Sequence, residues 1–253
     1  MKKYFPIVAF AVLCFGTIAA DAQFDFAGGQ TMGGSGSGME KLYGSNQTFS
    51  ATLEMQVSNN GNPMTMSGKM SFDKGSSRTE MNMADMKGGG IPPEAMTQMK
   101  SMGLDRMVTV SQSASKIVYV IYPNAQSYAE MTPPDSAAAS TNENSQVEIT
   151  KLGEETMNGH PCVKNKAVVT DKQGDKHQFT IWNATDLKDF PVKIEMNEQG
   201  NAITVSYQNI SFSKPDASLF SPPTGYTKYA SVQEMMQSVM MKKMGGGMGM
   251  PQQ

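Results

Sequence analysis

The side chains that could bind a metal ion or act as a nucleophile form one small group in this sequence. Met157, His160 and Cys162 lie close together, and His160 and Cys162 would lie on the same side of an extended strand. Soft donors of this kind select Cu(I). In the alternative interpretation, Asn158 and Gly159 form a turn, and Cys162 packs as a small apolar side chain in the strand that follows.

Methionine is the other source of soft donors, with 24 residues in a chain of 253. Met-x-Met pairs occur at Met64 and Met66, at Met81 and Met83, and at Met248 and Met250. Two residues apart on a strand place both sulfur atoms on one face, near enough for a single copper ion. The same spacing follows from strand alternation alone, so these pairs are not specific for copper.

The signatures of the common enzymes are absent from the sequence. It has two histidines and contains no His-x-x-x-His, Gly-x-Ser-x-Gly or phosphate-loop motif. A nucleophilic Cys162 with His160 as its base would also need an orienting group and an oxyanion site, and the neighbouring sequence supplies neither. We therefore predict a protein that is not an enzyme and that holds no cofactor.

Alternating apolar and polar residues predict three strands between Thr52 and Met83, with one apolar face and one polar, solvent-exposed face. The apolar face carries Leu53, Met55, Val57, Met64, Met66, Met70, Phe72, Met81 and Met83. Either these side chains fill the space between a sheet and its helices, or they line a cavity that an apolar ligand can enter. Trp182 has the opposite parity to Phe179 and Ile181, so it either packs under a covering loop or lines the same open side.

Further strands and two helices follow from the same kind of pattern. Strands are expected at 107–112, 116–122, 126–131, 147–155, 161–170, 177–184, 192–197 and 202–212, the last with a bulge near Gln208 or Asn209. A short helix is expected between Pro92 and Gly103, and the capping box of Ser231 and Glu234 begins another. The sequence thus predicts a mainly β (β-rich α+β) fold: a single curved antiparallel sheet, or incomplete barrel, of about ten to eleven strands with a short inserted helix and a C-terminal helix.

Residues 1–22 have the features of an export signal. Lys2 and Lys3 precede an apolar run, and Ala20-Asp21-Ala22 is typical of a signal-peptidase site. Lipidation at Cys14 is a weaker alternative, because the bulky Leu13 stands where a small residue is required. The predicted segments are a signal peptide (1–22), a disordered Gly/Ser-rich leader (23–39), a β domain (40–230), a Met-rich amphipathic helix (231–244) and a disordered tail (245–253).

We therefore expect an exported protein, periplasmic or extracellular, with no transmembrane span in the mature chain. The formal net charge of −2 at pH 7, with both signs well mixed, argues against a nucleic-acid partner.

Short motifs in the second half of the chain carry a resemblance. They are Leu152, Gly153, Glu155, Asn158 and Gly159, then Thr180, Ile181 and Trp182, then Leu187, Phe190, Pro191, Val192 and Lys193, and a turn at Gly200. Their order resembles the bacterial lipoprotein-carrier superfamily of the LolA and LolB type. The chain is more similar still to an uncharacterised exported family of that group, through Gly159-His160-Pro161 and a closing segment from Phe220 to Tyr226. The resemblance implies an incomplete barrel that holds acyl chains on its concave side.

Three hypotheses for the function follow. The first is a non-enzymatic protein that binds an apolar or amphipathic, lipid-like ligand on the Met-rich face and Trp182. The second is a Cu(I)-binding or buffering protein, with Met157, His160, Cys162, Met248 and Met250 as its candidate ligands. The third is an envelope assembly protein that docks a protein partner through an apolar stripe on the C-terminal helix, formed by Val232, Met235, Met236, Val239 and Met240.

Overall fold

A computed structural model describes residues 42–59, 62–88, 92–132, 146–170, 176–198 and 201–245. The predicted signal peptide with Cys14, the leader and residues 246–253 lie outside this range, so those assignments stay predictions. Within it, neither α-helix is long and apolar enough to span a membrane.

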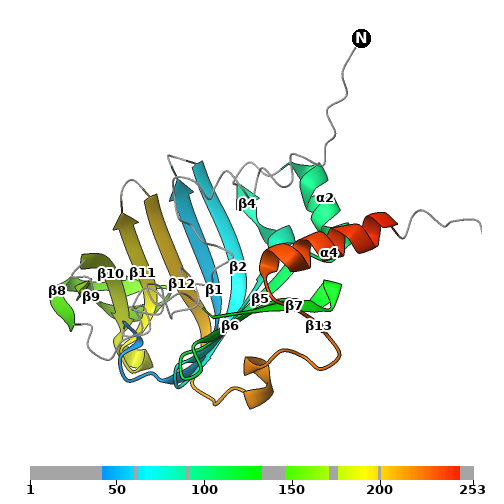
Figure 1. Cartoon of the computed structure of the whole chain (residues 1–253). Helices are drawn as coiled ribbons and strands as arrows, with labels where there is room; N and C mark the ends of the chain where they lie inside the picture. The colour runs from blue at the N-terminus through cyan, green and yellow to red at the C-terminus, as the bar shows by residue number, and fades with distance from the viewer. Residues whose placement is uncertain are drawn as a thin grey trace, which may run out of the picture.

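The described chain is mostly β-strand (Figure 1). The strands are β1 (Thr48–Asn59), β2 (Asn62–Asp73), β3 (Ser76–Asn82), β4 (Lys87–Gly88), β5 (Arg106–Gln112), β6 (Ile117–Tyr122), β7 (Ser127–Met131), β8 (Gln146–Met157), β9 (His160–Thr170), β10 (Lys176–Ala184), β11 (Phe190–Glu198), β12 (Asn201–Ser211) and β13 (Thr227–Tyr229). The α-helices are α2 (Pro93–Met102) and α4 (Val232–Gly245), and 3-10 turns form η2 (Met83–Asp85), η3 (Pro123–Ala125), η5 (Thr185–Leu187) and η6 (Ala217–Phe220).

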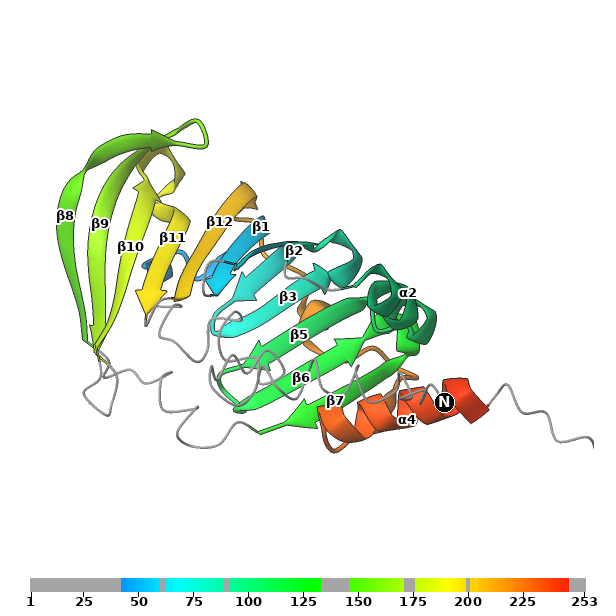
Figure 2. The ribbon, with the colours of Figure 1, turned by 90° about the horizontal axis from the view of Figure 1, so that it is seen from above.

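All the described strands belong to one 13-stranded sheet in the order β13-β7-β6-β5-β3-β2-β1-β12-β11-β10-β9-β8, with β4 beside β2. The sheet curves without closing (Figure 2), so the predicted fold class is confirmed. The predicted strand number was too low, because β4 and β13 have two and three residues and show no alternation to recognise. The sheet is also not wholly antiparallel, since β13 pairs with β7 in parallel.

The predicted bulge in β12 is confirmed. Ser50 pairs with Ser211 and Thr52 pairs with Gln208, so β12 has one extra residue in this interval, and Asn209 takes a positive φ of 51° there. The bulge turns the end of β12 while its apolar side chains remain on one face.

Helix α2 lies between Pro92 and Gly103 as predicted, and α4 is shifted by one residue from the predicted 231–244. Gly103 ends α2 in the left-handed conformation, with φ of 74°, and its N–H donates to the carbonyl of Lys100. The N–H of Glu234 donates to Ser231 Oγ at 3.1 Å, and Glu234 Oε2 accepts from the N–H of Ala230 at 3.1 Å, which caps α4.

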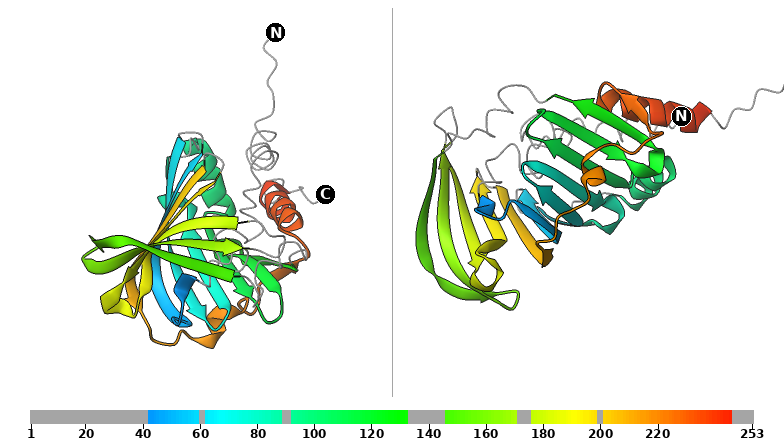
Figure 3. Two further views of the ribbon diagram at one scale, coloured as in Figure 1. Left: turned by 90° about the vertical axis from the view of Figure 1, so that its left-hand side faces the viewer. Right: turned by 90° about the horizontal axis from the view of Figure 1, so that it is seen from below.

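The outer face of β5 and β6 is covered by the segment that contains η6. Val108, Val110 and Ile121 are buried beneath Phe220, and Figure 3 (right) shows the orange segment crossing this part of the sheet. Because α4 covers the other side, β6 is buried on both faces, as its continuous apolar run predicts.

Glu80 links β3 to β5 on this outer face. Its carboxylate accepts a hydrogen bond from Arg78 Nε at 2.9 Å and another from Arg106 Nη2 at 2.6 Å. Burial raises the pKa of Glu80, but the hydrogen bonds from Arg106 and Arg78 outweigh it and hold the pKa below its ordinary value.

We expect Glu80→Gln to lower the free energy of unfolding at pH 7 by about 1–2 kcal/mol, because it removes charge from both hydrogen bonds. A lowered pKa in the folded state contributes stability that is present above the ordinary carboxylate pKa and is lost as the pH falls through the lowered one. Urea denaturation from pH 7 down to pH 3 should therefore show the two proteins converging in acid. Glu154→Gln, in an exposed pair with Lys151, is the control and should leave the midpoint at pH 7 unchanged.

Candidate ligand-binding face

The inner face of the sheet is the face that carries Leu53, Met55 and Val57 of β1. Cross-strand pairing extends it in rows. One row runs through Met66, Met55, Val205, Ile194 and Ile181 from β2 to β10. The next row runs through Met64, Val57, Ile203, Met196, Phe179 and Ala167 from β2 to β9. The inner face is therefore one continuous apolar surface across the middle of the sheet.

Most of the predicted ligand-binding residues lie together on this surface. Leu53, Met55, Val57, Met66, Met70, Phe72 and Met81 are buried in one cluster, and Met64 packs against it partly buried. Met83 was wrongly placed on the third strand: β3 ends at Asn82, and Met83 begins η2 and packs with Met102 and Met107 in a second cluster. Alternation identified the buried face, and ligand binding by these residues stays a prediction.

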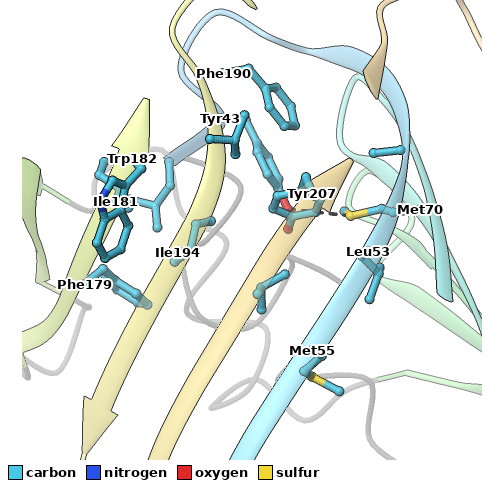
Figure 4. Close-up of a cluster of buried hydrophobic side chains, with 14 of the residues drawn as sticks. Tyr43, Leu53, Met55, Met70, Phe179, Ile181, Trp182, Phe190, Ile194 and Tyr207 are labelled. Carbon is cyan, nitrogen blue, oxygen red and sulfur yellow. Dashed lines mark hydrogen bonds between the residues drawn. The ribbon is translucent and has the colours of Figure 1, made fainter. Parts of the chain in front are cut away.

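An aromatic cluster closes one end of the inner face (Figure 4). Phe49 is fully buried, and its ring centroid lies 4.9 Å from that of Tyr43 and 4.8 Å from that of Phe190. The hydroxyls of Tyr43 and Tyr207 lie 2.8 Å apart, and the Tyr43 hydroxyl also donates to Met70 Sδ at 3.7 Å. Burial raises the pKa of Tyr207 to about 12, so this hydroxyl stays neutral.

Tyr43 and Phe49 lie before the predicted first strand, which begins at Thr52. The alternation in fact reaches back to Phe49, which pairs with Phe72 across β1 and β2. That pattern was a usable signal for Phe49. Tyr43 lies in a turn before β1 and carries no periodic signal.

The inner face becomes polar where β3 pairs with β5. We call this part the hydroxyl band: Ser77 pairs with Ser111, and Thr79 pairs with Thr109. All four side chains are buried. The sequence carries a usable signal for this band, because Ser77, Thr79 and Met81 alternate with partly buried residues along β3. The hydroxyl band separates the apolar cluster of β1 from the second cluster under the helices.

The second cluster lies at the β5–β7 end of the inner face, under α2 and α4. Met235 and Val239 of α4 are 0% and 5% exposed and pack with Val120 and Ala129 of the sheet. The helix stripe predicted to dock a partner is thus occupied by the chain's own sheet. On this helix, Met241 is a large apolar residue that stays exposed, at 67%.

Trp182 has the opposite parity to the inward-facing Phe179 and Ile181 and so points to the outer face of β10, although it belongs to the same buried cluster as the inner-face methionines. It precedes the register shift in β10 and pairs with Lys164 and Lys193, whose Nζ atoms lie 4.8 Å and 4.5 Å from the ring centroid. Its indole N–H donates to Glu155. The side chain is 3% exposed, so the two lysines and neighbouring strands cover it. These contacts favour the covered arrangement over the open one.

The soft-donor group follows the alternative interpretation. Asn158 and Gly159 form the β8–β9 turn with positive φ angles of 53° and 86°. His160 Nδ1 lies 2.8 Å from Asp186 Oδ2, an orienting carboxylate that the sequence did not reveal because it lies 26 residues away. The thiol of Cys162 donates to the carbonyl of His160 at 3.4 Å, and burial raises its pKa, which disfavours the thiolate.

No group of three or more His, Cys, Asp and Glu side chains that could hold a metal ion occurs within the described residues. Met248 and Met250 lie outside them. The described residues therefore add no observation in favour of copper.

A model of a protein family described as a domain of unknown function (DUF4412) matches residues 49–190, more than half of the chain. A search of curated proteins finds no match. The match confirms the part of the resemblance that predicted a family whose activity is not established.

Solved structures with a similar course of the chain come from several bacteria. An uncharacterised conserved protein from Thermus thermophilus is 12% identical, with 75% of this chain and 95% of that one covered and a TM-score of 0.45. A LolA superfamily protein from Nitrosomonas europaea is 8% identical, with 72% and 93% covered and a TM-score of 0.37. The lipoprotein LppX from Mycobacterium tuberculosis is 10% identical, with 64% and 85% covered and a TM-score of 0.38.

Proposed function

Since the chain belongs to the family described as a domain of unknown function (DUF4412), we propose its function from its own geometry. It is an exported, non-enzymatic binding protein that holds an apolar or amphipathic, lipid-like ligand on the inner face. The observation that carries the proposal is the continuous apolar surface that the paired strands build from β2 to β9.

The charge pattern of the sheet supports this proposal. The inward-facing side chains of β1, β2, β3, β5 and β12 carry no formal charge, whereas Arg78, Glu80 and Arg106 lie on the outer face. In the part of the chain that the structure describes, the buried apolar side chains of α2 and α4 belong to the cluster at the β5–β7 end of the inner face. An apolar surface on an unclosed sheet suits a ligand that must be kept from water.

The choice of methionine supports a variable ligand. Met55, Met66, Met70 and Met81 stand on the inner face where leucine or isoleucine would bury similar area. Methionine has more rotatable bonds, so ordering it costs more side-chain entropy, but it adapts to surfaces of different shape. This residue choice fits acyl chains of more than one length.

Lipid extraction and native mass spectrometry of the mature chain, purified from cells that export it, test the proposal. We expect a bound lipid, and saturable binding of a fluorescent fatty-acid probe once that lipid is removed. Absence of copurifying lipid together with absence of probe binding would contradict the proposal.

We expect joint replacement of Met55, Met66, Met70 and Met81 by leucine to preserve the fold, because each change nearly conserves volume and typically costs less than about 1.5 kcal/mol. The range of acyl chain lengths that compete with the probe should become narrower, since leucine adapts less. Competition by saturated fatty acids of increasing length measures this range. Met241→Leu, on the exposed side of α4, is the control and should leave the range as it is.

A further inference from the structure

The hydroxyl band contains a buried polar atom that lacks a partner. Thr79 is 5% exposed, and its Oγ1 has no hydrogen-bond partner within the described part of the chain. A buried hydroxyl without a partner is unfavourable, and a valine of the same shape would avoid this cost. The inner face therefore carries a hydroxyl that the folded chain itself leaves unused.

Flexible methionine side chains lie next to Thr79. On the inner face it pairs with Met70 of β2 and Thr109 of β5, and Met81 follows it on the same side of β3. Methionine side chains change rotamer at low cost, so a ligand could displace those of Met70 and Met81 without moving the strands. The hydroxyl thus lies where an inserted apolar chain would pass between the two clusters of the inner face.

We propose that Thr79 donates a hydrogen bond to a neutral oxygen of the bound ligand, the carbonyl of an acyl ester or amide. This inference rests on the proposed function and adds the chemical class of the ligand. Hydrocarbon on either side of the carbonyl lies on the apolar clusters, and the carbonyl lies at the hydroxyl band. The ligand is therefore an acylated molecule with its carbonyl enclosed, rather than a free hydrocarbon.

The absence of inward-facing charge on the neighbouring strands excludes a carboxylate at this point. Met70, Met81, Met107 and Thr109 surround Thr79 on β2, β3 and β5, and the arginines of this region face the opposite side of the sheet. An ionised group placed here would be buried without a counter-charge. A neutral carbonyl needs only one donor, and Thr79 supplies it.

The test compares the full mature chain with Thr79→Val and Thr79→Ser. Methyl palmitate and octadecane have the same number of atoms along the chain when the ester oxygen is counted. Each is tested as a competitor of a fluorescent fatty-acid probe. We expect Thr79→Val to weaken binding of methyl palmitate about tenfold and to leave octadecane unchanged. Thr79→Ser keeps the hydroxyl and should bind methyl palmitate like the original protein. Removal of the unpartnered hydroxyl should also raise the Tm of ligand-free Thr79→Val by about 2–4 °C.

The outcomes separate this inference from the proposed function. If neither compound binds the original protein, the proposed function fails, and this inference fails with it. If both compounds bind and Thr79→Val weakens both equally or neither, the ligand class is wrong while the binding function stands. A lower Tm for Thr79→Val with unchanged selectivity would show that the hydroxyl has a structural partner, which also overturns the inference.

Discussion

Phe49→Ala is expected to lower the free energy of unfolding by about 3–5 kcal/mol, because it leaves a cavity among packed aromatic rings. Phe49 is 0% exposed, and its ring lies within 6.5 Å, between centroids, of those of Tyr43, Phe72, Phe190 and Tyr207. These rings come from β1, β2, β11, β12 and the turn before β1. The substitution therefore loosens the seam where the two halves of the sheet meet.

Urea denaturation measures this loss, and near-ultraviolet circular dichroism reports the packing of the remaining aromatic rings. Phe49→Leu is the matched variant, because it fills much of the cavity and should cost clearly less. Phe212→Ala serves as a control, since Phe212 is only partly buried at the margin of the cluster and contacts Phe190 at 5.9 Å between centroids. Equal losses for Phe49→Ala and Phe212→Ala would contradict a central role for Phe49.

Gly68→Ala is expected to cost about 2–4 kcal/mol through a clash with the backbone rather than through a cavity. A Cβ atom at Gly68 would lie 2.3 Å from the carbonyl oxygen of Glu80 on β3. Gly68 lies on the inner face between Leu53 and Met81, so β2 and β3 would have to separate at the centre of the candidate ligand-binding face. Probe binding should fall together with stability.

The matched control for this prediction is Gly153→Ala on β8, where an added Cβ meets no atom within 4 Å. It should change the free energy of unfolding by no more than about 0.5 kcal/mol. Thermal denaturation and titration with the fluorescent fatty-acid probe on both variants give the comparison. A stable, probe-binding Gly68→Ala protein would mean that β2 and β3 can shift apart freely at this point.

Local patterns predicted the individual elements well because alternation and capping depend on neighbouring residues. The face that carries Leu53, Met55 and Val57, the bulge at Asn209 and the cap at Ser231 all follow from spacing alone. Strand partners depend on chain closure over long distances, which the sequence does not encode in any short window.

The candidate site shows the same difference between features set by local sequence patterns and features set by long-range strand pairing. The buried methionines could be predicted from parity, but the position of Trp182 between Lys164 and Lys193 required the register of three strands. Thr79 could not be singled out from the sequence, because threonine is common in strands. Only the structure shows that its hydroxyl has no hydrogen-bond partner. A buried hydroxyl without a hydrogen-bond partner can be recognised only from the three-dimensional structure.

The pairing of β1 with β12 sets when this protein can fold. Apart from β4, which lies beside β2, and β13, which joins β7 from the C-terminal end, the strands within each half pair with their neighbours along the chain. Met55, in contrast, meets Val205 only after some 150 intervening residues have been synthesised. Contacts of such long sequence separation raise contact order and slow folding. During that interval the edge of β1 that will pair with β12 is unpaired, and an unpaired strand edge can pair with other chains and start aggregation.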